Sequence, residues 1–138
     1  MVLTENQKIS ISSKSENIVL VEKMVEDVCD LFNIPEDHYG NILVALTEAV
    51  NNAIYHGNKA DPEKTIDISF KCKNNQISFI IKDQGKGFDP SALPDPTNPE
   101  NIEKPHGRGV FLMKNLADKV EFQDNGCCVV LTFGLNAN

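Results

Sequence analysis

Apolar and polar residues alternate with different periods along this chain of 138 residues. Three segments have the two-residue period of a half-buried strand: "QKISIS" at 7–12, "TIDISFKCK" at 65–73 and "QISFIIKDQG" at 76–85. The apolar run "GCCVVLTFGL" at 126–135 predicts a further strand. The pair Asn74 and Asn75, between the second and third strands, predicts a hairpin.

Three other segments have the period of an amphipathic helix. The first covers 13–34, where Ser13 and Glu16 have the spacing of an N-terminal capping box. The second runs from Pro35, which can open a helix, to Gly57, which can end one. The third follows "GRG" at 107–109, and its expected buried side consists of Val110, Met113, Leu116, Ala117 and Val120.

This order of elements predicts an α+β fold in two layers: a mixed, mainly antiparallel sheet with helices on one face. The length fits one domain, and no repeat or composition break divides the chain, so we expect a single domain at 1–138. Between Gly85 and His106 the sequence has five prolines and no apolar period. A loop of that length in a compact domain is typical of a functional segment.

The composition is that of a globular protein, with 41% hydrophobic residues, 24% charged residues and a formal net charge of −7. Binding to nucleic-acid phosphates depends on clustered Lys and Arg, so direct contact with nucleic acid is not expected. The N-terminal segment lacks a signal-peptide pattern, and no apolar run reaches membrane-spanning length. The four cysteines lack metal-ligand spacing and predict reduced structural thiols. We therefore expect a cytoplasmic protein with no membrane partner.

The middle of the second helix carries polar residues in an otherwise apolar segment, "EAVNNAIYHGN" at 48–58. On a helical wheel Glu48 and Asn52 lie away from the core side and one turn apart, so both side chains can act on one ligand. A solvated outer face has the same pattern, and the helix alone does not separate the two interpretations.

Two further motifs contain paired glycines. In "DQGKGFDP" at 83–90, a strand ends at Asp83, and Gly85 and Gly87 then allow positive φ and the close approach of a flat ligand. In "HGRGVFLM" at 106–113, Gly107 and Gly109 precede a helix whose first N–H groups can bind an anion. Ordinary turns also fit each motif taken alone. The motifs of P-loop proteins, dinucleotide-binding folds and eukaryotic-type protein kinases are absent.

Together and in this order, the three motifs resemble those of one superfamily: the ATPase domain shared by gyrase, the Hsp90 chaperone, sensor histidine kinases and MutL. Within it the closest resemblance is to the bacterial anti-sigma factor serine/threonine-protein kinases. The segments "LTEAVNNAIYHGN" at 46–58 and "HGRGVFLMKNLADKVEF" at 106–122 are particularly similar to that branch. The resemblance covers nearly the whole chain, from Lys8 to Phe133.

The resemblance implies a site for ATP and Mg²⁺. Asn52 would ligate the metal through its side-chain oxygen, which is the hard ligand that Mg²⁺ prefers. Glu48 would act as general base on the attacking hydroxyl. Asp83 would accept a hydrogen bond from the adenine amino group, and Gly85 and Gly87 would leave room for the adenine ring.

The resemblance also implies that the segment 88–106 is a lid over the nucleotide. Gly107 and Gly109 would turn this lid so that backbone amides reach the phosphates. Lys104 and Arg108 are the neighbouring cations, and either could meet the γ-phosphate.

At two places the chain departs from the family pattern. Related kinases carry an arginine just before the third motif, where this chain has Pro105 and His106. Related proteins usually have a threonine that supports adenine through its hydroxyl, whereas this chain has Cys127, whose thiol is a poorer donor.

The activity implied is ATP-dependent phosphorylation of a serine or threonine on an anti-sigma factor antagonist of the STAS type. The same protein would bind a sigma factor, and the related anti-sigma factors imply a homodimer. The rival interpretation is a non-catalytic nucleotide-binding regulatory module that sequesters a partner protein. The presence of Glu48 favours catalysis, because nucleotide binding alone does not require a base.

Overall fold

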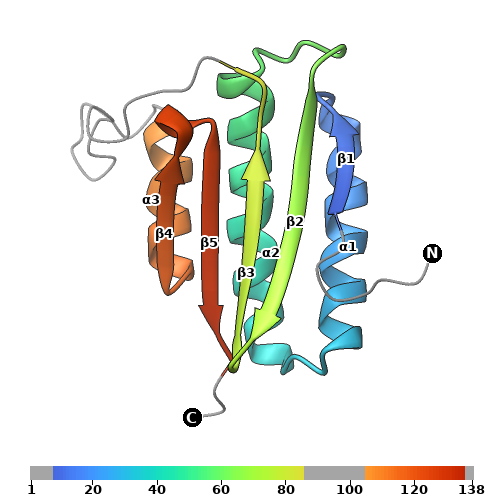
Figure 1. Ribbon diagram of the computed structural model, residues 1–138, viewed down its shortest axis with the longest axis vertical. Coiled ribbons are helices and arrows are strands. Elements are labelled where there is room, and N and C mark those ends of the chain that lie inside the picture. Colours follow the sequence, from blue (N-terminus) through green and yellow to red (C-terminus); the bar gives the residue numbers. More distant parts are fainter. Residues whose placement is uncertain (1–7, 86–104, 136–138) are drawn as a thin grey trace.

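The computed structural model describes residues 8–85 and 105–135, which form a five-stranded sheet covered by helices (Figure 1). Across the sheet the strands follow the order β1-β2-β3-β5-β4, and every pairing between described strands is antiparallel. The strands are β1 Lys8–Ser12, β2 Thr65–Lys73, β3 Gln76–Lys82, β4 Lys119–Gln123 and β5 Cys128–Gly134.

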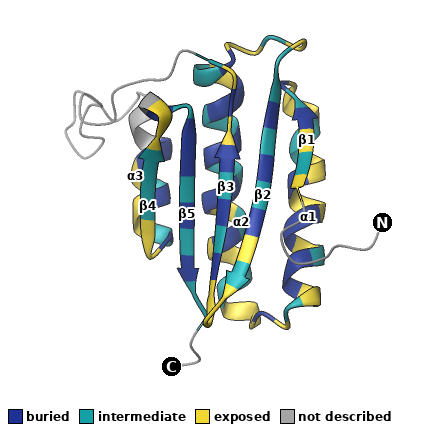
Figure 2. Ribbon diagram, in the orientation of Figure 1, coloured by how far each residue is buried: buried dark blue, intermediate teal, exposed yellow. Residues whose placement is uncertain are grey.

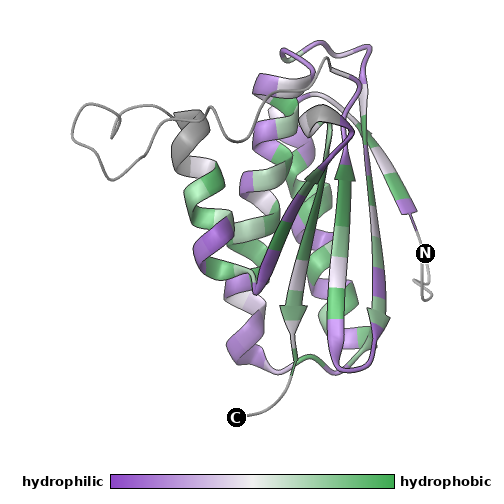
Figure 3. Ribbon diagram, turned by 60° about the vertical axis from the view of Figure 1, so that its left-hand side comes forward, coloured by the Kyte–Doolittle hydropathy of each residue, from purple (hydrophilic) through white to green (hydrophobic). Residues whose placement is uncertain are grey.

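The α-helices of the described ranges all cover the same face of the sheet, which is visible in the turned view of Figure 3. They are α1 Ile18–Leu31, α2 Glu36–Asn52 and α3 Pro105–Leu116. The middle helix, α2, packs against both of the others. One side of each helix and the inward side of β1, β2, β3 and β5 are buried together as the core (Figure 2), and Val120 and Phe122 of β4 are partly buried against it. No helix in these ranges is long and apolar enough to cross a membrane.

The predicted α+β class of two layers is confirmed, although the described sheet is antiparallel throughout and not mixed. The two-residue period explains the layering: on β3, Ile77, Phe79 and Ile81 are buried against the helices. Asn74 and Asn75 have φ values of 53° and 61°. These left-handed conformations are what a two-residue hairpin requires, so the predicted hairpin is also confirmed.

The third helix differs from its prediction at both ends. It begins at Pro105, so Gly107 lies in its first turn and Gly109 lies inside it, not ahead of it. It ends at Leu116, and Val120 belongs to β4, a strand that was not predicted. The alternation "KVEFQ" at 119–123 is short and directly continues the apolar period of the helix, which concealed the change of element.

The expected capping box at Ser13 is wrong. The Ser13 hydroxyl donates to the backbone carbonyl of Lys64 at 2.9 Å and accepts from Asn58 Nδ2 at 2.7 Å. A short 3-10 turn at Ser15–Asn17 precedes α1, which has no side-chain cap. Ser13 is only 2% exposed and joins the β1–α1 connection to the start of β2.

The second helix changes form near its C-terminus. After Asn52 it continues as a π-helical turn, Ala53–Gly57, and so ends at Gly57 as predicted. The N–H of Asn58 then closes the turn on the Ala53 carbonyl at 2.8 Å. Such turns are frequent at functional sites because they shift the backbone locally. Here the turn brings the end of α2 against the end of β3.

Candidate functional site

The first motif brings two half-buried polar side chains to adjacent turns of α2. Asn52 lines a pocket together with Asp83 and Cys127, which lie on other segments. Glu48 lies beside α3, because a Cβ built on Gly109 would be 3.2 Å from Glu48 Oε2. A solvated outer face does not describe these two residues, since each meets a separate part of the fold.

Asp83 follows β3 and is 9% exposed. Its N–H donates to the Cys127 carbonyl at 2.8 Å, and its Oδ1 accepts from the Gly85 N–H at 2.8 Å. Its Oδ2 accepts no hydrogen bond from the part of the chain that the structure describes. Burial raises the pKa of the Asp83 carboxyl, while the Gly85 N–H and the charge of Lys64 act in the opposite direction. Asp83 Oδ2 is therefore an acceptor oxygen in the pocket wall, and burying its carboxylate costs solvation free energy.

The π-helical turn and the segment after β3 approach so closely that two positions require glycine. A Cβ on Gly85 would overlap the backbone carbonyl of Gly57. A Cβ on Gly57 would in turn meet the carboxylate of Asp83, with Oδ1 at 2.8 Å. The missing side chains are thus what lets the Asp83 carboxylate lie between the two backbones.

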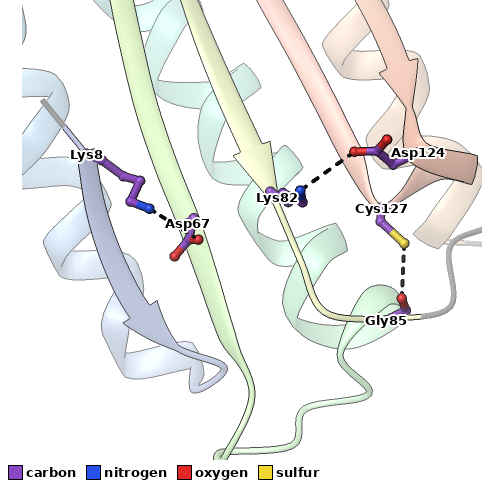
Figure 4. A network of polar contacts seen from close by, with 6 residues as sticks. All are labelled: Lys8, Asp67, Lys82, Gly85, Asp124 and Cys127. Carbon is purple, nitrogen blue, oxygen red and sulfur yellow. Dashed lines mark hydrogen bonds and ion pairs between the residues drawn. The ribbon is translucent and has the colours of Figure 1, made fainter. Parts of the chain in front are cut away.

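Cys127 connects β5 to the same segment. Its thiol donates to the Gly85 carbonyl at 3.0 Å (Figure 4). Burial, helped by the Asp83 and Asp124 carboxylates, raises the pKa of the Cys127 thiol. The thiol therefore remains protonated and able to donate at neutral pH. Figure 4 also shows an ion pair of 3.9 Å between Lys82 and Asp124, beside this contact.

The pocket between these groups is narrow. Its lining is Ala49, Asn52, Ala53, Gly57, Ile81, Asp83, Phe122, Gly126, Cys127 and Val129. Most of these side chains are apolar, and Asp83 and Asn52 supply the polar groups, which is typical of a site for a small molecule. The volume open to the centre of a water molecule is about 10 Å³, roughly the room that one water needs. A space of this size is too small for a purine ring.

The start of α3 supplies the third motif. Gly107 and Arg108 lie in its first turn, and the N–H of Gly107 has no partner within the helix. Gly109 is the fifth residue of the helix, so its N–H belongs to the helical ladder and not to the anion-binding end. Gly109 therefore lies within the helix and not in a turn ahead of it. Its observed contribution is the close approach of the α3 backbone to Glu48.

Three of the sequence predictions fall wholly or partly outside the described residues. Gly87 and Lys104 lie outside them, as does the predicted lid from Phe88 to residue 104. The last two lid residues, Pro105 and His106, belong to α3, so the predicted loop ends earlier than expected.

Asn52 fits the role of a single magnesium ligand. A carboxamide oxygen is the hard donor that Mg²⁺ prefers, so the Asn52 side chain would be a suitable ligand for the ion. In the described ranges, no group of three or more His, Cys, Asp or Glu side chains could hold a metal. All four cysteines lie in these ranges and are free thiols there.

Two residues of the site were missed from the sequence. Gly57 was expected only as a helix end, yet it makes room for Asp83. Asn58 was assigned no role, yet it is fully buried and its Oδ1 accepts from the Gln84 N–H at 2.7 Å. The available signal was a polar residue directly after a helix-ending glycine, which is also an ordinary turn pattern.

Comparison with known protein families gives an independent result. The histidine kinase-like ATPase domain matches residues 11–133. The chain belongs to this family. The family recognition made from the three motifs is thereby confirmed, and so is the α+β fold.

Individual relatives agree with this assignment. The chain is similar to a protein named serine-protein kinase RsbW from Halalkalibacterium halodurans, with 29% identity over 93% of this chain and 82% of the relative. Another protein of that name, from Bacillus cereus, is 26% identical over 93% of this chain and 84% of the relative. The relatives confirm the resemblance to bacterial serine-protein kinases.

A solved structure supports the fold. The chain resembles a crystal structure of the RsbU and RsbW domains of a Mycobacterium tuberculosis protein, with a TM-score of 0.71 and 14% identity. The match covers 98% of this chain but 34% of that longer one. At this identity the likeness concerns the fold alone.

Proposed function

We propose that this protein is an ATP-dependent serine/threonine protein kinase that phosphorylates an anti-sigma factor antagonist of the STAS type. The observation that carries the proposal is convergence: Asn52, Asp83 and Cys127, from three distant segments, line one pocket. Glu48 lies one helical turn from Asn52. Relatives named serine-protein kinase support a serine as the acceptor.

Adenine recognition falls to Asp83 in this proposal. Its Oδ2 is available to accept from the exocyclic amino group, while Oδ1 is engaged by the Gly85 N–H. A guanine base presents a carbonyl at the equivalent place, and two acceptors would face each other. Because the carboxylate is 9% exposed, water does not screen this mismatch well.

Phosphoryl transfer falls to Glu48 and Asn52. Asn52 would hold Mg²⁺, which, when bound, neutralises charge on the phosphates. Glu48 would accept the proton of the serine hydroxyl as its oxygen attacks, because a neutral hydroxyl is a weak nucleophile. Arg108 and Lys104 are the candidate cations for the γ-phosphate.

The remaining expectations concern the cellular setting. The partners would be the antagonist and a sigma factor, with no direct contact to nucleic acid or membrane. A homodimer and a cytoplasmic location complete the proposal, together with a single domain over 1–138.

The test is a pair of assays with the wild type, Glu48→Gln and Asn52→Ala. One assay measures Mg²⁺–ATP affinity by calorimetry, and the other measures transfer of labelled phosphate to the antagonist from the same genome. Glu48→Gln keeps the shape and removes the base, so it should bind ATP and lose about 10²–10⁴-fold in transfer. Asn52→Ala should lose Mg²⁺-dependent binding itself.

Two outcomes would overturn parts of the proposal. Transfer at the wild-type rate by Glu48→Gln would remove its role as base. A wild type that binds ATP but phosphorylates no antagonist of its genome would instead be a nucleotide-binding module that sequesters a partner.

A further inference from the structure

A buried polar cluster lies behind the adenine-binding segment and is not part of the pocket lining. Its centre is Asn58, which has no exposed surface. Buried carboxamides are costly unless their donors and acceptor are all matched. The partners of Asn58 therefore indicate which part of the structure the buried carboxamide holds in place.

All polar groups of the Asn58 side chain have partners. Its Oδ1 accepts from the Gln84 N–H at 2.7 Å. Its Nδ2 donates to Ser13 Oγ at 2.7 Å and to the Thr65 carbonyl at 3.0 Å. A backbone N–H only donates and a carbonyl only accepts, so these partners fix the orientation of the carboxamide.

The cluster joins segments that are remote in sequence. Ser13 follows β1, and its hydroxyl also donates to the Lys64 carbonyl at 2.9 Å. The Thr65 N–H donates to Gln84 Oε1 at 2.7 Å, so Gln84 is held through both its backbone and its side chain. The cluster thus joins the β1–α1 connection, the start of β2 and the segment after α2 to one residue, Gln84, which lies just after β3.

Gln84 stands between the two residues that shape the adenine pocket, Asp83 and Gly85. Asp83 Oδ1 accepts from the Gly85 N–H, so the carboxylate keeps its direction only while the Asp83–Gly85 turn keeps its form. The Gly85 position is already crowded by the Gly57 carbonyl. A shift of Gln84 would therefore turn the Asp83 carboxylate away from the pocket.

The geometry points to Asn58 as a positioning residue for adenine selectivity. It fixes the Asp83–Gly85 turn through Gln84 and ties that turn to Ser13. This inference rests on the nucleotide site proposed above. Asn58 touches no substrate, so its effect is on the direction of the Asp83 carboxylate and not on the chemical step.

The experiment compares Asn58→Ala and Ser13→Ala with two matched controls. Asn17→Ala removes another carboxamide from the β1–α1 connection, where Asn17 Nδ2 donates to the Ser12 carbonyl and hydroxyl at 2.9 Å and 2.8 Å. Ser78→Ala removes a hydroxyl that bonds Thr132 at 2.9 Å, far from the turn. For each variant, calorimetry gives the dissociation constants of Mg²⁺–ATP and Mg²⁺–GTP, and thermal unfolding gives the Tm.

Asn58→Ala should weaken ATP binding by about tenfold, the cost of an unmatched buried group, and lower the ATP/GTP preference by a similar factor. Ser13→Ala should change both quantities in the same direction by about two- to fivefold, since one bond of the cluster is lost. The two controls should lower the Tm while leaving ATP affinity and the ATP/GTP preference unchanged. A purely structural role would move the Tm alone.

Unchanged ATP affinity and unchanged ATP/GTP preference in folded Asn58→Ala would overturn the inference. If Asn58→Ala does not fold, Ser13→Ala decides, and nucleotide binding equal to that of Ser78→Ala overturns it. A wild type that fails to bind Mg²⁺–ATP overturns the nucleotide site itself and this inference with it. Normal ATP binding by the wild type and by all variants is a different result, because it overturns the role of Asn58 and leaves the nucleotide site in place.

Discussion

Gly57, which ends the π-helical turn after α2, and Asp83, which follows β3, lie in contact, and the contact exists only because position 57 has no side chain. A Cβ there would lie 2.8 Å from Asp83 Oδ1 and closer still to Oδ2. Gly57, Gly85 and the Asp83 carboxylate are packed tightly together here, since the Gly57 carbonyl also lies against Gly85. The direction of the Asp83 carboxylate thus depends on a glycine that belongs to the first motif.

Gly57→Ala should therefore displace the Asp83 carboxylate and weaken Mg²⁺–ATP binding by about tenfold or more, because a buried hydrogen bond to adenine is lost. Gly40→Ala is the matched control on the same helix, since a Cβ at Gly40 meets nothing within 4 Å. It should stabilise the protein by about 0.5–1 kcal/mol through helix propensity. Calorimetry and thermal unfolding measure both effects. Wild-type ATP affinity in folded Gly57→Ala would contradict the prediction.

The raised pKa of Asp83 predicts a dependence of stability on pH. The folded state favours the protonated carboxyl, so Asp83 contributes stability that is fully present below its unfolded pKa and is lost as pH rises through its folded pKa. Asp83→Asn removes this titration. Relative to the variant, the nucleotide-free wild type should lose stability as pH rises from about 4 toward neutrality.

The measurement is the Tm of both proteins without nucleotide across that pH range. At neutral pH, Asp83→Asn should have the higher Tm and the weaker ATP affinity, since a carboxamide is cheaper to bury but offers a donor to adenine. A difference in Tm that does not change with pH would show that Asp83 does not titrate in this way.

Sequence periodicity was sufficient for the layers of the fold. The alternation in β2 and β3 and the two asparagines between them specify a hairpin with one buried face, because side chains alternate strictly across a strand. The same local reasoning failed at β4, where Val120 fits both a helical and a strand period. Only the pairing of β4 with β5 resolves the choice, and pairing is not encoded locally.

The candidate site was predictable in its residue types and only partly in its geometry. Asn52 and Asp83 were identified from motifs, but their meeting in one pocket depends on how α2 packs across the sheet. The contributions of Gly57 and Asn58 depend on contacts with Asp83 and Gln84. Such contacts join segments far apart in sequence, and no periodic pattern records them.

Cys127 should act through its hydrogen bond to Gly85. Cys127→Ala removes this bond and should weaken ATP binding by about two- to tenfold, while Cys127→Ser restores a donor and should bind at least as tightly as the wild type. The control is Cys128→Ala. In the strand register Cys128 of β5 lies between Lys82 of β3 and Gln123 of β4, and not at Gly85. The measured quantity is the dissociation constant of Mg²⁺–ATP. Equal affinities for Cys127→Ala and Cys127→Ser would mean that the thiol donor has no role.

Gly109 provides a test of catalysis that leaves the base itself in place. A Cβ at this position would lie 3.2 Å from Glu48 Oε2, so the flexible Glu48 side chain must move by a few tenths of an ångström. Gly109→Ala should stabilise α3 through helix propensity. It should also slow phosphoryl transfer by about tenfold, because small displacements of a catalytic group are costly. ATP affinity should remain at the wild-type value, since Asp83 and Asn52 are untouched.

Single-turnover transfer, nucleotide calorimetry and the Tm together separate these effects. Gly134→Ala serves as the control, because its Cβ would meet Asp118, and not Glu48, at 3.4 Å. Unchanged transfer in a more stable Gly109→Ala would mean that the contact between α3 and Glu48 does not position the base.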